Sequence, residues 1–193
     1  MHSPTTLPEL RSAVVGRWSS LSIELRPTED RAGRGVIEPT YLTRDFTYRP
    51  DDTFVGIIRM FGDDYGHVPL LEFEFAGELR WGGAHPIAEG AFSVDYILNE
   101  TFAVTPLNAP AAEMLNQVPA PGVEPFEANQ RQDILGRAFP LFAIEEGQIV
   151  TDYDLLYLRD DMLFFGAKHV DGTPFDRPER RPHQLQVPLV RGS

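Results

Sequence analysis

Three charged side chains on two neighbouring predicted strands form the clearest candidate site in the sequence. Glu24 and Arg26 lie two residues apart in a strand expected over residues 17–26, and Arg44 lies in the next strand, expected over residues 41–49. Strict alternation puts Glu24 and Arg26 on the same side of their strand. A carboxylate beside two guanidinium groups pairs with one and leaves the other able to hold an anionic oxygen bidentately.

Three interpretations of these residues stay open. They can form a structural ion pair at one end of the fold, beside Trp18, or lie exposed on the surface. Alternatively, an arginine anchors the polar end of a ligand. In an enzyme the same arginine would stabilise developing negative charge, while Glu24 or a tyrosine transfers a proton. The candidate catalytic residues are therefore Glu24, Arg26 and Arg44.

Alternation with a period of two residues dominates the chain and predicts the strands that would position these side chains. The clearest case spans residues 70–80, where apolar side chains alternate with Glu72, Glu74 and Glu78. This pattern is typical of an antiparallel strand with one face in solvent and one face in the core. Further strands are expected over residues 53–61, 91–99, 100–105, 129–135, 141–144, 149–159, 162–170 and 184–190.

One stretch favours a helix instead. Residues 108–116 begin with Asn108, a good N-cap, and continue with Pro110 and several strong helix formers. About ten short strands with one short inserted helix predict an all-β fold, an up-and-down antiparallel β-barrel. A two-sheet sandwich without a pocket is the alternative. We expect a flexible N-terminal tail over residues 1–13 and a single barrel domain over residues 14–191.

A barrel of about ten strands is too wide for its side chains to fill, which predicts a cavity for an apolar ligand. Aromatic residues make up 11% of the chain and supply many candidates for the lining. The residues expected to contact a ligand are Trp18, Arg26, Arg44, Phe46, Phe73, Phe75, Tyr96 and Tyr153.

Two further groups of charges have weaker functional interpretations. Asp152 and Asp154 could form an acid–base pair, but carboxylates two residues apart on a solvent-facing strand usually only increase solubility. The charged run over residues 176–181 is expected to be a solvated loop that closes over one end of the barrel through ion pairs; a functional lid is the alternative.

A longer series of motifs occurs in a fixed order: Gly16-Arg17-Trp18, Glu24-Leu25-Arg26-Pro27, Tyr41-Leu42-Thr43-Arg44, Val104-Thr105-Pro106, Leu115-Asn116, Gln132-Asp133, residues 176–181 and residues 187–190. From about residue 16 to residue 190 this series resembles the adenomatosis polyposis coli down-regulated one domain family. The resemblance implies a lipocalin-like barrel that holds apolar, lipid-like ligands and whose first tryptophan closes one end. It brings no known catalytic residue.

The sequence departs from that family in ways that bear on function. The animal members are secreted, membrane-anchored Wnt inhibitors with cysteines and two such barrels, whereas this chain has no cysteine, and Ile23 lies within its Glu-x-Arg-Pro strand. The chain is therefore similar to a stand-alone bacterial relative, and Wnt inhibition is not expected to transfer. Without cysteine, disulfide frameworks, zinc ribbons, iron–sulfur clusters and thiol nucleophiles are excluded.

The charge and hydropathy of the chain limit the kinds of binding partner that can be expected. With 17 basic and 29 acidic residues, the net charge is −12, which disfavours nucleic acids and anionic membranes. No apolar run approaches the roughly 18 residues of a membrane span, and no signal peptide is evident, so we expect a cytoplasmic protein. The histidines do not cluster, so neither a metal site nor a cofactor is expected. A homodimer is left open.

The expected function is binding of an apolar or lipid-like small molecule in the barrel cavity, with an arginine near its polar end. The alternative is a cofactor-free cyclase or isomerase of natural-product biosynthesis that folds a reactive intermediate in the same cavity. An interaction module with a solid core is a third possibility. The sequence does not decide whether the protein is an enzyme.

Overall fold

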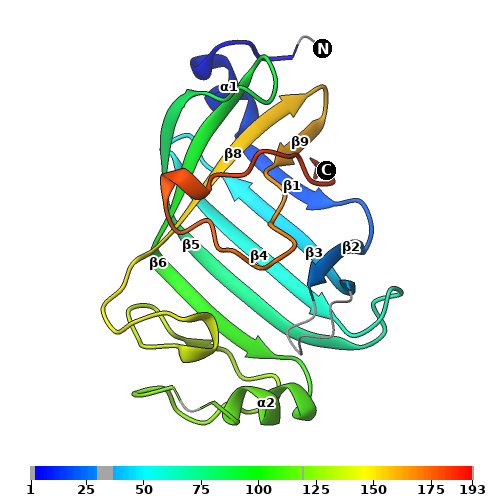
Figure 1. The fold of residues 1–193 in the computed structure, drawn as a ribbon, viewed down its shortest axis with the longest axis vertical. Coiled ribbons are helices and arrows are strands. Elements are labelled where there is room, and N and C mark those ends of the chain that lie inside the picture. The colour runs from blue at the N-terminus through cyan, green and yellow to red at the C-terminus, as the bar shows by residue number, and fades with distance from the viewer. Residues whose placement is uncertain (1–2, 30–36, 119, 193) are drawn as a thin grey trace.

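The computed structural model describes residues 3–29, 37–118 and 120–192 of the 193. Its strands join one antiparallel sheet, which confirms the all-β class (Figure 1). The strands are β1 (Gly16–Ser20), β2 (Glu24–Glu29), β3 (Ile37–Tyr48), β4 (Thr53–Phe61), β5 (Pro69–Ala84), β6 (Ala91–Pro106), β7 (Gln132–Asp133), β8 (Val150–Arg159), β9 (Met162–Phe165) and β10 (Leu189–Arg191). The helices are α1 (Leu7–Val14) and α2 (Ala109–Asn116), with short 3-10 turns η1 (Pro140–Phe142) and η2 (Pro178–Arg180).

The sheet closes on itself. Neighbouring strands follow the order β1-β10-β9-β8-β6-β5-β4-β3-β2, and β1 also pairs with β3. Eight of the described strands therefore form a hydrogen-bonded ring. β3 is long enough to pair with β2 along its first half and with β1 along its second half. A closed ring directs one face of every strand toward a shared interior, where the core and any cavity must lie.

The passage from β1 to β2 explains how charged residues come to face this interior. Between Ser19 and Glu24 the chain takes five steps while its partners on β3 take three, so two extra residues bulge out. An even number of extra residues preserves the side-chain alternation. Trp18 and Glu24 consequently face the same, inner side, whereas Leu21 and Leu25 are exposed. The inner wall is therefore polar at Glu24.

The prediction of a flexible tail over residues 1–13 is wrong, because α1 lies there. Leu10 and Val14 are fully buried in the core around Trp18. The Glu9 carboxylate accepts a hydrogen bond from the Thr6 backbone N–H at 3.0 Å, which caps the first turn. α1 closes one end of the ring in Figure 1, so the described part of the chain has two α-helices where the sequence predicts one.

α2 confirms the predicted helix and lies at the opposite end of the ring (Figure 1). The Asn108 side chain accepts a hydrogen bond from the Ala111 backbone N–H at 2.8 Å, as expected of an N-cap. The buried residues of α2 pack against the ends of β5 and β6 and against the chain that follows the helix. Two apolar clusters, one beneath each helix, thus occupy the two ends of the interior.

Several predicted strands differ from those observed. Residues 91–99 and 100–105 form a single strand, β6, while only Gln132–Asp133 is extended within residues 129–135. Of residues 141–144, the first two lie in η1. Ala143, at the C-terminal end of η1, has a left-handed φ of 55°. A left-handed residue cannot continue a strand, so the apolar run there folds into a turn that covers the interior.

The anchoring of α1 can be tested by truncating one of its buried side chains. We expect Leu10→Ala to lower the free energy of unfolding by about 2–5 kcal/mol, because it leaves a cavity in the core. The matched control Leu25→Ala, at a side chain that is 60% exposed, should change the stability by about 0.5 kcal/mol or less. Denaturant titration measures both, and a small effect of both variants would contradict the role given to α1.

Candidate functional site

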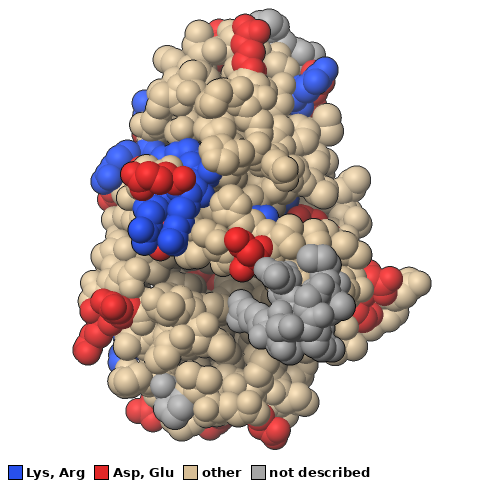
Figure 2. Space-filling model, in the orientation of Figure 1, with Lys and Arg blue, Asp and Glu red and all other residues tan. Residues whose placement is uncertain are grey.

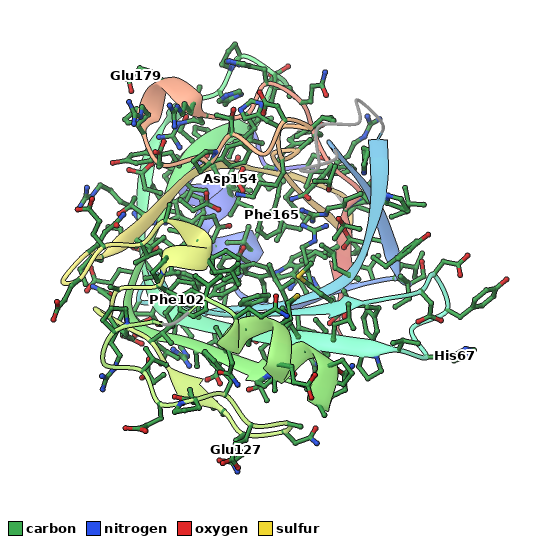
Figure 3. All side chains as sticks on the ribbon, turned by 60° about the horizontal axis from the view of Figure 1, so that its bottom comes forward. His67, Phe102, Glu127, Asp154, Phe165 and Glu179 are labelled. Atoms are coloured by element: carbon green, nitrogen blue, oxygen red, sulfur yellow. The ribbon has the colours of Figure 1, made fainter. Side chains whose placement is uncertain are left out.

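A cavity of about 510 Å³ lies within the ring, between the two apolar clusters. Its volume is within the range of small-molecule sites. Figure 3 shows Phe102, Asp154 and Phe165 around this interior, whereas His67, Glu127 and Glu179 point away from it. The apolar part of the lining is formed by Leu42, Phe46, Ile58, Met60, Phe73, Phe75, Tyr96, Leu98, Phe102, Phe142, Val150 and Phe165, and the polar part by Arg26, Arg44, Asp152, Asp154, Lys168 and Gln186.

Aromatic rings in van der Waals contact form much of the apolar wall. The Phe46 ring lies 4.9 Å from that of Phe165 and 5.8 Å from that of Phe75, centroid to centroid. Gly56 on β4 makes room for two of these rings, because a Cβ atom there would lie 2.3 Å from Cε2 of Phe75. The aromatic wall therefore depends on a position where any larger residue would overpack the interior.

Six of the eight residues predicted to contact a ligand line the cavity: Arg26, Arg44, Phe46, Phe73, Phe75 and Tyr96. Trp18 does not line it. Its indole N–H donates to the Val14 carbonyl at 2.7 Å, and the Arg191 guanidinium lies 4.2 Å from its ring, so Trp18 belongs to the closed α1 end. Tyr153 points to the outside of β8, where Arg181 lies 5.5 Å from its ring.

The orientation of β8 is opposite to the sequence prediction. Asp152 and Asp154, expected on a solvent-facing side, line the cavity instead. The alternation gave a poor signal here because Leu155 and Leu156, on opposite faces, are both fully buried. Residues 166–188, which we call the crossing segment, cover the outer side of β8: the Tyr153 backbone N–H donates to the Phe175 carbonyl at 2.8 Å.

The crossing segment also carries part of the site. Lys168 and Gln186 contribute side chains to the cavity lining from this segment. Arg181 anchors it by donating to Asp95 at 2.7 Å and to the Val94 carbonyl at 2.9 Å. Arg181 thus holds the segment against the outside of β6 and β8, and closure over one end of the barrel stays a prediction. Figure 2 shows basic side chains gathered over η2, within this segment, and a hollow in the surface beside them.

Glu24 lies between the two arginines at the polar end of the cavity. Its Oε1 accepts from Arg44 Nε at 2.9 Å, and its Oε2 accepts from Arg26 Nη2 at 3.2 Å. Ser20 donates a third bond, at 2.6 Å, to Oε1. The Glu24 and Arg44 side chains are 3% and 2% exposed. Arg44 also donates from Nη2 to the Val187 carbonyl, at 2.6 Å.

This arrangement leaves hydrogen-bond donors to spare. One carboxylate faces two guanidinium groups, and burial together with the charge of Arg44 lowers the pKa of Arg26 to about 10, so Arg26 stays charged at neutral pH. Among the described residues, Arg44 Nη1, Arg26 Nε and Gln186 Oε1 are the buried side-chain polar atoms without a hydrogen-bond partner. All three residues line the cavity. An unpaired buried polar group costs about 1–3 kcal/mol, which a ligand or water would recover.

Asp154 is the other buried acid of the cavity. Its Oδ1 accepts from the backbone N–H groups of Leu155, at 2.7 Å, and Gly166, at 2.8 Å. Gly166 permits this approach, since a Cβ atom there would lie 2.6 Å from Oδ1. Burial raises the pKa of Asp154 to about 6, although the charge of Lys168 opposes the rise. The carboxyl group therefore changes its protonation state close to neutral pH.

Two buried tyrosines place further polar groups in the interior. The hydroxyl groups of Tyr48 and Tyr96 are hydrogen-bonded at 2.7 Å. Burial raises the pKa of both well above the usual value, so both remain neutral. Neither hydroxyl is suited to accept a proton as a general base at neutral pH.

Within residues 3–29, 37–118 and 120–192, no three histidine or carboxylate side chains come together as metal ligands, and no helix is long and apolar enough to cross a membrane. No known protein-family model matches the chain. The family resemblance stated above therefore stays a prediction.

The ion pairs of Glu24 should matter more than those on the outer surface. Glu24→Gln removes the carboxylate that pairs with buried Arg44 and partly buried Arg26, and we expect a loss of about 3–5 kcal/mol in unfolding free energy. The control Glu72→Gln removes the partner of exposed Arg59, at 2.6 Å, and should cost about 1 kcal/mol or less. Denaturant titration compares the two, and equal losses would contradict a special role for Glu24.

Asp154 should impose a pH dependence on stability. Because its folded pKa, about 6, exceeds its ordinary value of 3.8, the folded protein binds this proton more tightly than the unfolded chain. The resulting stability is fully present below the unfolded pKa and is lost as the pH rises through about 6. Relative to Asp154→Asn, the wild-type protein should therefore lose about 3 kcal/mol from about pH 4 to about pH 7. A constant difference between the two unfolding free energies would show that Asp154 does not titrate in this way.

Proposed function

We propose that the protein binds an apolar or lipid-like small molecule in the cavity, with Arg44 and Arg26 at its polar end. One observation carries the proposal: the guanidinium groups of buried Arg44 and partly buried Arg26, each with an unpartnered N–H donor, form part of an otherwise mainly aromatic and aliphatic wall. An amphipathic molecule with an oxygen-bearing head matches both parts. Its head would pair with the spare N–H groups, and its tail would cover the phenylalanine rings.

We further propose that the fold is a lipocalin-like up-and-down barrel. It is supported by the closed ring, in which most neighbouring strands are consecutive in the chain. It is also supported by the closure of one end by α1 and Trp18. A cytoplasmic location for this binding protein, expected from the sequence, stays a prediction.

The size and lining of the cavity suggest how affinity would depend on the ligand. Each methylene group moved from water into the apolar wall contributes about 0.8 kcal/mol. Affinity should therefore rise with chain length until the cavity is full. The head group adds the charge-assisted bonds of the arginines, about 1.5–3 kcal/mol for a hydrogen bond to a charged group. A carboxylate head therefore distinguishes this site from a cavity that selects only by apolar contact.

The cofactor-free cyclase or isomerase is the second candidate function. The observation that favours it is an acid of near-neutral pKa, Asp154, in the lining of the same cavity. Glu24, the acid first suggested for this chemistry, is less suitable. Both of its carboxylate oxygens are occupied by donors from Arg44, Arg26 and Ser20.

The binding proposal is tested with saturated fatty acids and the alcohols of equal chain length, using displacement of a fluorescent fatty-acid probe. We expect Arg44→Met to weaken fatty-acid binding by about 10–100-fold. Alcohol binding should change by less than about threefold, because a neutral head forms weaker bonds with a guanidinium group. The matched control Arg59→Met alters an arginine on the outside of β4 that is 53% exposed, and should bind both ligands as the wild type does.

Native mass spectrometry of the purified protein gives an independent readout. A copurifying small molecule that is lost on denaturation would support the proposal. A mass without any such molecule, together with no displacement by acids or alcohols of any length, would reject it.

A further inference from the structure

We propose that Asp154 is a general base in the cavity, which removes a proton from an activated C–H group of the bound molecule while Arg44 and Arg26 hold the oxygen that becomes negatively charged. The substrate class is a carbonyl compound with an acidic C–H group beside the carbonyl and an apolar body. This inference rests on the proposed function, since it requires that the cavity admit a small molecule.

The carboxyl group of Asp154 is held in a defined orientation. Both of its hydrogen bonds, from the Leu155 and Gly166 backbone N–H groups, go to Oδ1. Within the described residues Oδ2 has no hydrogen-bond partner, although the side chain is part of the cavity lining. The backbone fixes one oxygen, so the other is available to a bound molecule without any movement of the main chain. Figure 3 shows Asp154 at the interior of the ring, near Phe165.

The charges around Asp154 suit a base that works near neutral pH. Asp152, on the same strand, raises its pKa, and Lys168, from the crossing segment, lowers it. The guanidinium of Arg181 donates to the backbone carbonyl of Asp154 and to Asp95. Arg26 and Arg44 supply the positive charge of the same cavity, and the neutral hydroxyls of Tyr48 and Tyr96 form the remaining polar surface nearby.

The proposed step balances without any cofactor. The C–H proton passes to Oδ2 of the Asp154 carboxylate, the C–H electron pair forms a carbon–carbon double bond, and the carbonyl π electrons move to oxygen. The enolate oxygen takes the spare N–H groups of the arginines, which stabilise it electrostatically. When the substrate also carries a carbon–carbon double bond in the β,γ position, the negative charge extends to the γ carbon. Return of the proton to the γ carbon then yields the α,β-unsaturated isomer and regenerates the carboxylate. No oxidant or reductant is consumed.

A purely structural role would require only one of the two carboxylate oxygens of Asp154. The hydrogen bonds to Leu155 and Gly166 use only Oδ1, an oxygen that asparagine also possesses. The second oxygen has no hydrogen-bond partner among the described contacts. Burying a charged carboxylate lowers stability, and the charges of Lys168 and Arg26 oppose this cost. Asp154→Asn therefore separates the structural role, which it retains, from the basic role, which it removes.

The test uses 5-nitrobenzisoxazole, an apolar probe for a base in an apolar cavity. The base removes the ring C–H proton, the N–O bond breaks, and a coloured cyanophenolate forms that is followed by absorbance. We expect the wild-type protein to accelerate this reaction and Asp154→Asn to lose at least about 100-fold of the acceleration. The control Asp161→Asn, an exposed carboxylate in the turn between β8 and β9, should keep the full rate.

The pH profile of the unmodified protein gives a second readout that a structural role would not produce. The rate should fall as the pH decreases through about 6, because only the ionised carboxylate accepts a proton. The fatty acid used above should inhibit the reaction by occupying the same cavity. A flat pH profile, or an unchanged rate in Asp154→Asn, would overturn the role of Asp154.

These outcomes separate the two proposals. Fatty-acid binding with no Asp154-dependent rate would reject the general base and leave the binding function standing. Absence of both binding and catalysis would reject both proposals. An Asp154-dependent rate that the fatty acid does not inhibit would place the reaction outside the proposed cavity and overturn the inference.

Discussion

The neutralisation of two buried guanidinium groups by one carboxylate is the interaction on which the rest of the site depends. Glu24 binds Arg44 and Arg26 with its two oxygens, at 2.9 and 3.2 Å. Charges removed from water are tolerated only when hydrogen bonds replace their hydration. Ser20 and the Val187 carbonyl supply further bonds. This single cluster thereby joins the consecutive strands β1, β2 and β3 to the crossing segment, which is distant from them in the chain.

The same cluster determines what the cavity can hold. Glu24 occupies only some of the guanidinium donors, and Arg44 Nη1 and Arg26 Nε have no partner among the described residues. The remaining wall is largely aromatic and aliphatic. A wholly apolar molecule would leave the donors unpaired, and a small hydrophilic molecule would leave the rings exposed. An amphipathic molecule satisfies both, so the physical argument selects the class of ligand rather than any particular compound.

Closure at the two ends connects this electrostatic arrangement with reactivity. The α1 cluster around Trp18 and the α2 cluster lie on either side of the cavity. Burial in this interior raises the pKa of Asp154 to about 6. A carboxyl group in this range is able to exchange a proton near neutral pH. Binding and proton transfer would therefore depend on the same buried interior.

The sequence by itself determined the features that depend on local geometry. Alternation of period two identified Arg44, Phe46, Phe73 and Phe75 as facing one interior, because neighbouring residues in any strand point to opposite sides. The capping side chain of Asn108 marked α2 for a similarly local reason. The charges of Glu24, Arg26 and Arg44 could be grouped because consecutive antiparallel strands usually pair.

Only the tertiary structure decided the rest. β8 is buried on both faces, so its pattern could not indicate that Asp154 enters the cavity and Tyr153 does not. α1 spans only eight residues, and its order depends on a core formed by distant strands. The position of Trp18 outside the cavity depends on that helix as well. For β8 and α1 the deciding contacts join segments far apart in the chain, and short-range patterns carry no record of such contacts.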